Sequence, residues 1–234
     1  PIMLKQDMEK DILQVFAEPY NTLILDKKAF KNPIPEIAGL APKDNMKAWV
    51  DRKLFIHNLG HAASAYFGYG YNPHFVYLFE ALAIPEIHKK VRDTMLQSAC
   101  ILLAKYPKEF TLQDLTAHID DLLARFQNKA LGDTIFRVGC DLYRKLGPED
   151  RLAGAIRAAI EFDLPYDRIL DALVAGCHFR ATDESGQLFL DDATFAALYA
   201  QEREQILLAV CGFHPEKNRS LWEEFRSIDQ QWVR

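Results

Sequence analysis

Helical spacing of apolar residues dominates the sequence from Asp44 onward. In one segment, Leu115, Ile119 and Leu122 recur at three- and four-residue intervals, the period of one helix face. Segments of this kind, bounded by Pro, Gly or polar capping residues, predict helices at 44–66, 85–106, 111–126, 149–162, 166–178, 191–210 and 218–232. So many amphipathic helices must bury their apolar faces against one another. The sequence therefore predicts a mainly α, multi-helical domain over residues 44–234.

The first 43 residues have a different pattern. ILQVF (12–16) and TLILD (22–26), separated by AEPYN, predict two short strands joined across a turn, a β-hairpin-like segment. Three prolines in KNPIPEIAGLAP bar regular helix, so we expect an irregular connector there. Residues 1–43 are therefore predicted to be a strand pair and connector from a domain junction.

Composition narrows the class of protein. The chain has 234 residues, 49% of them hydrophobic, and a net charge of −5 with both signs interspersed. We expect no nucleic-acid partner and no membrane partner, because there is no basic footprint, polybasic arm, apolar span or signal peptide. The four cysteines stand singly, without CxxC pairs, which favours buried thiols in a reducing compartment. The expected location is the cytoplasm.

A polar stripe marks one of the predicted helices. Lys53, His57 and His61 recur every four positions, which on an α-helix at about 100° per residue places them along one side. Asn58 stands at the edge of this stripe. The other positions are apolar enough to bury the helix, at Leu54, Phe55, Ile56, Leu59 and Ala62. A polar stripe on a buried helix has to face a cavity.

Three interpretations of this stripe compete. It is a solvated helix face, a metal site, or a proton-transfer site in which apolar neighbours lower the pKa of Lys53 so that it removes a hydroxyl proton. The two histidines have the spacing of a zinc helix, but Asn58 stands where the metalloprotease pattern needs a glutamate, and no third ligand is evident. We therefore expect no metal. His57 fits a satisfied or exposed histidine better than a site residue.

The pattern K-x4-N-x2-H, formed by Lys53, Asn58 and His61 in DRKLFIHNLGHAASAYFGY, resembles the signature of the long-chain polyol dehydrogenases, the mannitol dehydrogenase family. GDTIFRVGCDLYRKLGPEDRLAG (132–154) is similar to a later segment of the same family's substrate domain. EPYNTLILDKKAFKNPIPEI also has the expected form. The resemblance implies a multi-helical dehydrogenase C-terminal domain of the 6-phosphogluconate dehydrogenase-like type.

The resemblance also implies an activity: NAD-dependent interconversion of mannitol 1-phosphate and fructose 6-phosphate, without a metal. Lys53 would be the general base, Asn58 would donate hydrogen bonds to the developing alkoxide, and His61 would orient the reacting or neighbouring hydroxyl. A mannitol 2-dehydrogenase or a hexuronate reductase of the same family would share these three residues. From a different class, a non-catalytic helical interaction domain is the alternative, and a metalloenzyme is the third.

No strand in the sequence runs into G-x-G-x-x-G, so the dinucleotide-binding fingerprint is missing. In the family the Rossmann domain comes first. We therefore expect the chain to be the carboxyl-terminal portion of a longer protein, with that domain as its partner, and to be inactive alone. Cofactor-binding residues of this chain stay unknown.

Candidate residues for the far end of a sugar phosphate lie in the second block. Arg137, Arg144, Lys145 and Arg151 fall within fifteen residues, and arginine can donate two parallel hydrogen bonds to phosphate. Surface ion pairs with neighbouring acids are the alternative. Arg137 and Arg144 are preferred, because Arg144 stands off an i, i+4 ladder of alternating charges. Glu18, between the two predicted strands, is either a surface carboxylate or a partner of Lys53.

Overall fold

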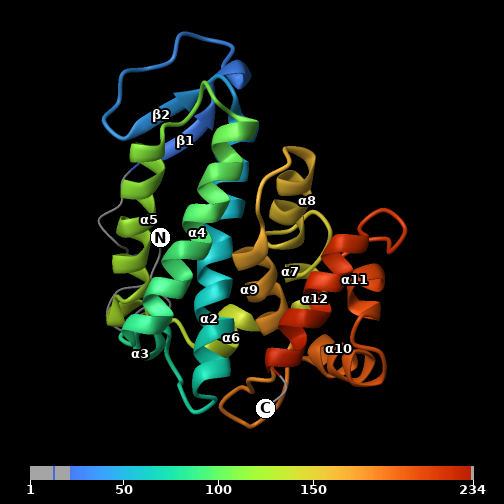
Figure 1. The fold of residues 1–234 in the computed structure, drawn as a ribbon. Coiled ribbons are helices and arrows are strands. Elements are labelled where there is room, and N and C mark those ends of the chain that lie inside the picture. Colours follow the sequence, from blue (N-terminus) through green and yellow to red (C-terminus); the bar gives the residue numbers. More distant parts are fainter. Residues whose placement is uncertain (1–12, 14–21, 233–234) are drawn as a thin grey trace.

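The computed structural model describes residue 13 and residues 22–232. Helices make up most of this part of the chain, and a small sheet lies at one end (Figure 1). The strands are β1 (Leu23–Asp26) and β2 (Leu40–Lys43). The helices are α1 (Met46–Arg52), α2 (Leu59–Tyr71), α3 (Leu78–Leu82), α4 (Pro85–Lys105), α5 (Leu112–Phe126), α6 (Ile135–Gly139), α7 (Leu142–Lys145), α8 (Ala153–Glu161), α9 (Asp167–Cys177), α10 (Leu190–Gln201), α11 (Gln205–Ala209) and α12 (Arg219–Trp232). Two short 3₁₀ turns, η1 (Lys27–Ala29) and η3 (Lys129–Leu131), and a π-helical turn, η2 (Lys53–Asn58), complete the order.

The sheet pairs a predicted strand with an unexpected partner. TLILD forms β1, whereas the other predicted strand, 12–16, lies outside the described residues except for Leu13. The partner is β2, which pairs with β1 in parallel, with Leu23 opposite Leu40. The irregular connector was therefore wrong for residues 40–43. Pro42 is tolerated because β2 is an edge strand and, in this register, the backbone nitrogen of residue 42 faces away from β1.

The centre of the molecule is α2, which packs against α3, α4, α6 and α9. In Figure 1, α2 and α4 run side by side through the bundle. The sequence predicted that α2 ends near Tyr66, before Gly68 and Gly70, but it continues to Tyr71. The two glycines serve close packing, since a Cβ would lie 2.6 Å from the Ala81 Cβ at Gly68 and 2.1 Å from the Trp232 ring at Gly70.

The long amphipathic helices were predicted to within a few residues, as α4, α5, α8, α9 and α12. The single helix predicted at 191–210 is wrong, because α10 and α11 are separated at Glu202–Glu204. This break directs Arg203 onto the buried Asp229 of α12, with Nη1 3.1 Å from Oδ2. The short helices α3, α6 and α7 were not predicted.

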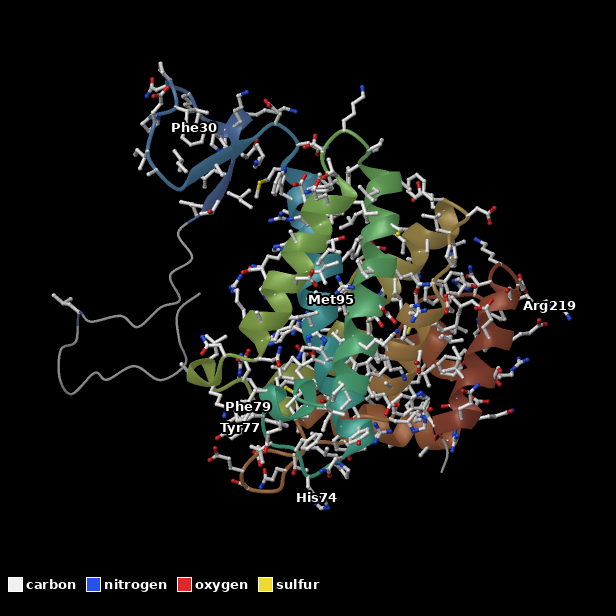
Figure 2. The ribbon with its side chains drawn as sticks, turned by 60° about the vertical axis from the view of Figure 1, so that its left-hand side comes forward. Phe30, His74, Tyr77, Phe79, Met95 and Arg219 are labelled. Atoms are coloured by element: carbon white, nitrogen blue, oxygen red, sulfur yellow. The ribbon has the colours of Figure 1, made fainter. Side chains whose placement is uncertain are left out.

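Figure 2 places the sheet layer, marked by Phe30, at one end of the molecule and Arg219, at the start of α12, on the far side. All four cysteines are free, but only Cys177 and Cys211 are buried; Cys100 is exposed, contrary to expectation. In the described part of the chain, no helix has the length and apolar character needed to cross a membrane.

Candidate active site

The K-x4-N pattern coincides with the π-helical turn η2, which begins at Lys53 and ends at Asn58. Asn45 caps α1 by accepting from the Ala48 N–H, and the chain then widens, so that the Leu59 N–H donates to the carbonyl of Leu54, five residues back. The single α-helical stripe expected for this segment is therefore wrong. On an α-helix, residues five apart point about 140° apart, whereas a π-helix bonds residue i to residue i+5. The π turn thus brings Lys53 and Asn58 to nearly the same side.

A cavity of about 830 Å³ opens beside this turn. Its described lining comprises Thr22, Ile24, Met46, Trp49, Val50, Arg52, Lys53, His57, Asn58, His118 and Arg125. The side formed by β1 and α1 is apolar except for Arg52, whereas η2 and α5 contribute two cations and two histidines. None of these described lining residues is acidic. The volume suits a small organic ligand, and the charge suits an anionic one.

Lys53 is exposed on the cavity wall, and His57 lines the same cavity from the next turn. That His57 is not a site residue stays a prediction, although its side chain shares the cavity with Lys53. Its ring lies edge-on to Phe126, with centroids 5.5 Å apart. Burial lowers the pKa of His57 to about 3, and His61 and Arg125 add to the effect. The ring is therefore neutral at pH 7.

His61 does not line this cavity but lies one turn further on. It stacks on Phe126 at 4.8 Å, and its Nε2 is 2.9 Å from Oδ2 of Asp133. Burial lowers the pKa of His61 to about 3, and Arg137 acts in the same direction. In a neutral ring, the nitrogen that faces a carboxylate has to be the donor, so Nδ1 is the acceptor.

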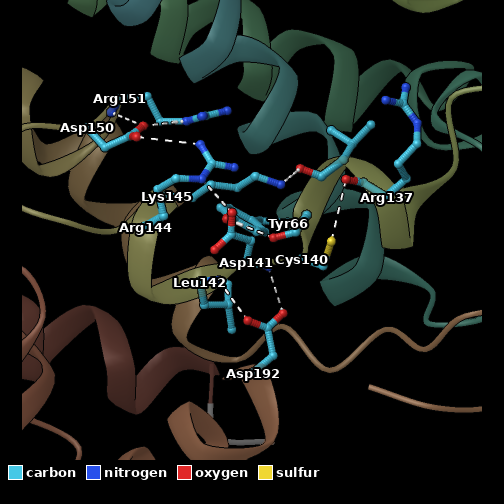
Figure 3. A network of polar contacts seen from close by, with 12 residues as sticks. Tyr66, Arg137, Cys140, Asp141, Leu142, Arg144, Lys145, Asp150, Arg151 and Asp192 are labelled. Carbon is cyan, nitrogen blue, oxygen red and sulfur yellow. Dashed lines mark hydrogen bonds and ion pairs between the residues drawn. The ribbon is translucent and has the colours of Figure 1, made fainter. Parts of the chain in front are cut away.

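Cations of the second block gather around His61. Arg137, Lys145 and Arg151 all influence its pKa, although they lie at least 76 residues further along the chain. Figure 3 shows Lys145 extending from α7 with Arg151 on one side and Arg137 on the other. Arg137 also pairs with Asp133, so this carboxylate joins the histidine to the arginine.

Lys145 is a buried amine, 6% exposed, that donates to the carbonyl of Val138 at 2.7 Å. Burial lowers the pKa of Lys145 to about 8. Its helix is anchored from a distance: the Asp192 carboxylate on α10 accepts from the N–H groups of Asp141 and Leu142 at 3.0 and 2.7 Å. Asp141 takes a left-handed φ of 72° to make this turn.

The sequence suggested that Arg144 stands apart from the ion pairs of its block, but the structure shows it paired. It is exposed, bonds Asp141 through Nε, and lies 3.8 Å from Asp150. The expectation failed because α6 and α7 are separate short helices, so the i, i+4 ladder does not run through the block. Glu18 lies outside the described residues, and its role stays a prediction.

Sequence reasoning missed two cavity residues. His118 and Arg125 belong to the helix predicted at 111–126, whose apolar spacing indicates only that it packs against the core. They lie seven residues apart and therefore on one face of α5, a spacing that is visible in the sequence. Burial lowers the pKa of His118 to about 4.

Among the described residues, no group of three or more His, Cys, Asp or Glu side chains is placed to hold a metal ion. The prediction of a metal-free site stays a prediction.

The fold is shared with solved polyol dehydrogenases. Pseudomonas fluorescens mannitol 2-dehydrogenase, in ternary complex with NAD and D-mannitol, superposes with a TM-score of 0.70 at 21% identity, covering 93% of this chain and 45% of that one. D-sorbitol dehydrogenase in substrate-free form gives 0.63 at 20% identity, covering 82% and 40%. The chain thus spans less than half the length of these proteins. Residues 45–223 match the family model of the mannitol dehydrogenase C-terminal domain, and the chain belongs to this family.

Proposed function

We propose that the chain is the substrate domain of an NAD-dependent mannitol-1-phosphate 5-dehydrogenase, which interconverts mannitol 1-phosphate and fructose 6-phosphate. The observation that carries the proposal is the π turn η2, which presents Lys53 and Asn58 to one cavity. His61 lies on the following turn, and the cations Arg137, Lys145 and Arg151 act on it from the second block. Membership of the mannitol dehydrogenase family supports the same reaction class.

The protein's task in alcohol oxidation is to remove the hydroxyl proton. NAD supplies the hydride acceptor when bound. Nζ of Lys53 takes the proton from the hydroxyl as the C–H electron pair leaves, and returns it during ketone reduction. Among the cationic groups of the cavity wall, Lys53 is suited to this exchange because, unlike arginine, an amine can lose its proton.

Asn58 and His61 act on the substrate oxygens. The Asn58 amide donates to the oxygen on which negative charge develops, help of the oxyanion-hole kind. His61, with Nε2 held by Asp133, presents Nδ1 as an acceptor for the reacting or adjacent hydroxyl.

A preceding Rossmann domain completes the proposed enzyme. The structural relatives are about twice as long as the matched region, and one of them is a complex with NAD. The cavity beside η2 is large enough for a sugar and the reactive end of a cofactor together. We assign no residue of this chain to the dinucleotide, because it has no G-x-G-x-x-G turn.

The phosphate is assigned to Arg137 and Lys145. Both lower the pKa of His61, which lies one turn beyond the cavity of Lys53, and Arg151 adds a third positive charge. Free mannitol needs no such cluster. A mannitol 2-dehydrogenase remains the second candidate, because the structure with the TM-score of 0.70 is such an enzyme.

Turnover of the full-length protein separates the two candidates. We expect NADH-dependent reduction of fructose 6-phosphate with a kcat/KM at least about 100-fold above that for fructose, since a charge-assisted phosphate site contributes about 3 kcal/mol or more. Equal or better turnover of free fructose would make the chain part of a mannitol 2-dehydrogenase. Free and phosphorylated polyols with NAD give the matching test in the oxidation direction.

A further inference from the structure

The π turn η2 needs a hydrogen-bond donor from outside its own helix. The Leu59 N–H reaches back five residues to the Leu54 carbonyl and also faces that of Ile56. In the α-helix that begins at Leu59, each N–H bonds the carbonyl four residues back, so regular winding pairs Gly60 with Ile56. Where the five-residue pattern gives way to the four-residue pattern, the carbonyl of Phe55 is paired by neither. Phe55 is only 5% exposed, and a buried carbonyl without a partner is costly.

Ser98 supplies that donor. Its hydroxyl, on α4, donates to the Phe55 carbonyl at 2.7 Å, and the residue is fully buried. The close approach of α4 explains the contact: Met95, three residues earlier and in the middle of the bundle in Figure 2, packs where a Cβ of Gly60 would be, 2.4 Å from its Sδ. Serine is small enough to fit between the two helices at this distance.

A second donor holds the end of the same turn. Nη1 of Arg151 lies 3.4 Å from the carbonyl of Asn58. This arginine is 7% exposed, and its Nε bonds the Asp150 carboxylate at 2.7 Å. The carbonyls of the π turn are thus bonded from two other parts of the chain.

We propose that Ser98 is a positioning residue for the dehydrogenase reaction: its hydrogen bond to Phe55 stabilises the π turn and so keeps Lys53 and Asn58 on the same side. The inference rests on the proposed function. Ser98 is fully buried and is not among the lining residues of the cavity, so its effect on the rate passes through the turn. If the turn relaxed to α-helical spacing, Asn58 would rotate away from Lys53.

The test uses the full-length enzyme with Ser98→Ala and a matched control, Ser64→Ala. Ser64 is also fully buried and its hydroxyl also donates at 2.7 Å to a backbone carbonyl, that of Gly60, but within regular α-helix. We expect Ser98→Ala to lower kcat by about 10- to 100-fold with each KM within about twofold of the parent, as for a misplaced catalytic group. Ser64→Ala should leave kcat within about twofold.

Ser98→Cys provides a second variant. The thiol is larger than the hydroxyl but is still a weak hydrogen-bond donor, so kcat should lie between those of the parent and Ser98→Ala. Hydrogen exchange of the peptide covering η2 should become faster in Ser98→Ala and stay unchanged in Ser64→Ala.

Two results would separate failure of this inference from failure of the proposed function. If Lys53→Ala abolishes turnover while Ser98→Ala behaves like Ser64→Ala in kcat, the positioning role is overturned and the dehydrogenase remains. If Lys53→Ala itself keeps its rate, the proposed function fails first.

Discussion

Among single residues, the buried amine of Lys145 makes the site sensitive to pH. With its pKa lowered to about 8 by burial, Lys145 is charged below pH 8 and neutral above it. The affinity for a phosphorylated substrate should therefore fall as pH rises through about 8, seen as a rising KM for fructose 6-phosphate. Lys145→Arg should remove this rise, because arginine stays protonated. A KM that is flat to pH 9.5 in the parent would argue against Lys145 at the phosphate.

Arg137 and Arg144, two of the three arginines of the second block, should differ in their effect on the KM for fructose 6-phosphate. Arg137→Ala should raise the KM for fructose 6-phosphate by about 10- to 100-fold, since a charge-assisted hydrogen bond contributes about 1.5–3 kcal/mol. Arg144→Ala should change it by less than about threefold, because this exposed arginine pairs with Asp141 and Asp150 at the surface. Steady-state kinetics give the KM for fructose 6-phosphate of each variant. Equal increases would show that Arg144 also binds the phosphate.

At this scale the sequence shows which residues can share a face but not how the helix is wound. The spacing of Lys53 and Asn58 was legible, whereas the π turn depends on Ser98, which lies 43 positions beyond the carbonyl that it bonds. The ion pairs of Arg144 were not predicted for a similar reason. Its partner Asp141 is positioned by a hydrogen bond from its N–H to the Asp192 carboxylate, which belongs to a helix distant in sequence.

At the scale of elements, close helix packing depends on glycines within α2. A Cβ at Gly68 would lie 2.6 Å from the Cβ of Ala81 on α3, an atom fixed to the backbone that cannot move aside. Gly68→Ala should therefore lower the free energy of unfolding by about 1–3 kcal/mol, although alanine favours helix by about 1 kcal/mol. Urea denaturation followed by circular dichroism measures this. A stabilised variant would show that α2 and α3 are not in such close contact.

Long amphipathic helices were predictable because their apolar period persists over several turns, as in α5. The short elements were not, because contacts distant in sequence define them. β2 forms only by pairing with β1, and α7 begins where Asp192 accepts two N–H groups. The break after α10 places Arg203 against Asp229 of α12, a contact with a later helix that the local sequence does not reveal.

The whole molecule should lose stability in mild acid. Burial holds the pKa of His57 at about 3 and of His118 at about 4, whereas the unfolded chain protonates histidine near 6.5. The unfolded state therefore binds more protons below pH 6.5, and stability falls as pH drops through this window, by roughly 1–2 kcal/mol per histidine between pH 7 and pH 5.

His118→Gln checks this directly. The variant removes one titrating group, so its free energy of unfolding should fall less between pH 7 and pH 5 than that of the parent. Urea unfolding at both pH values provides the comparison, and the difference at pH 8, where the histidine is neutral in both states, is the internal reference. Parallel curves for parent and variant would show that His118 is not kept neutral by burial.

In the proposed reaction the amine of Lys53 exchanges the substrate's hydroxyl proton. The most direct measurement is kcat for oxidation of mannitol 1-phosphate with NAD by the full-length protein carrying Lys53→Ala, beside Lys47→Ala. Lys47 is an exposed lysine of the preceding helix, with Nζ 3.4 Å from Asp51. We expect a loss of roughly 10²–10⁴-fold for Lys53→Ala, with unchanged circular dichroism, and a rate within about twofold of the parent for Lys47→Ala. A folded Lys53→Ala enzyme that keeps its rate within about threefold would contradict this role.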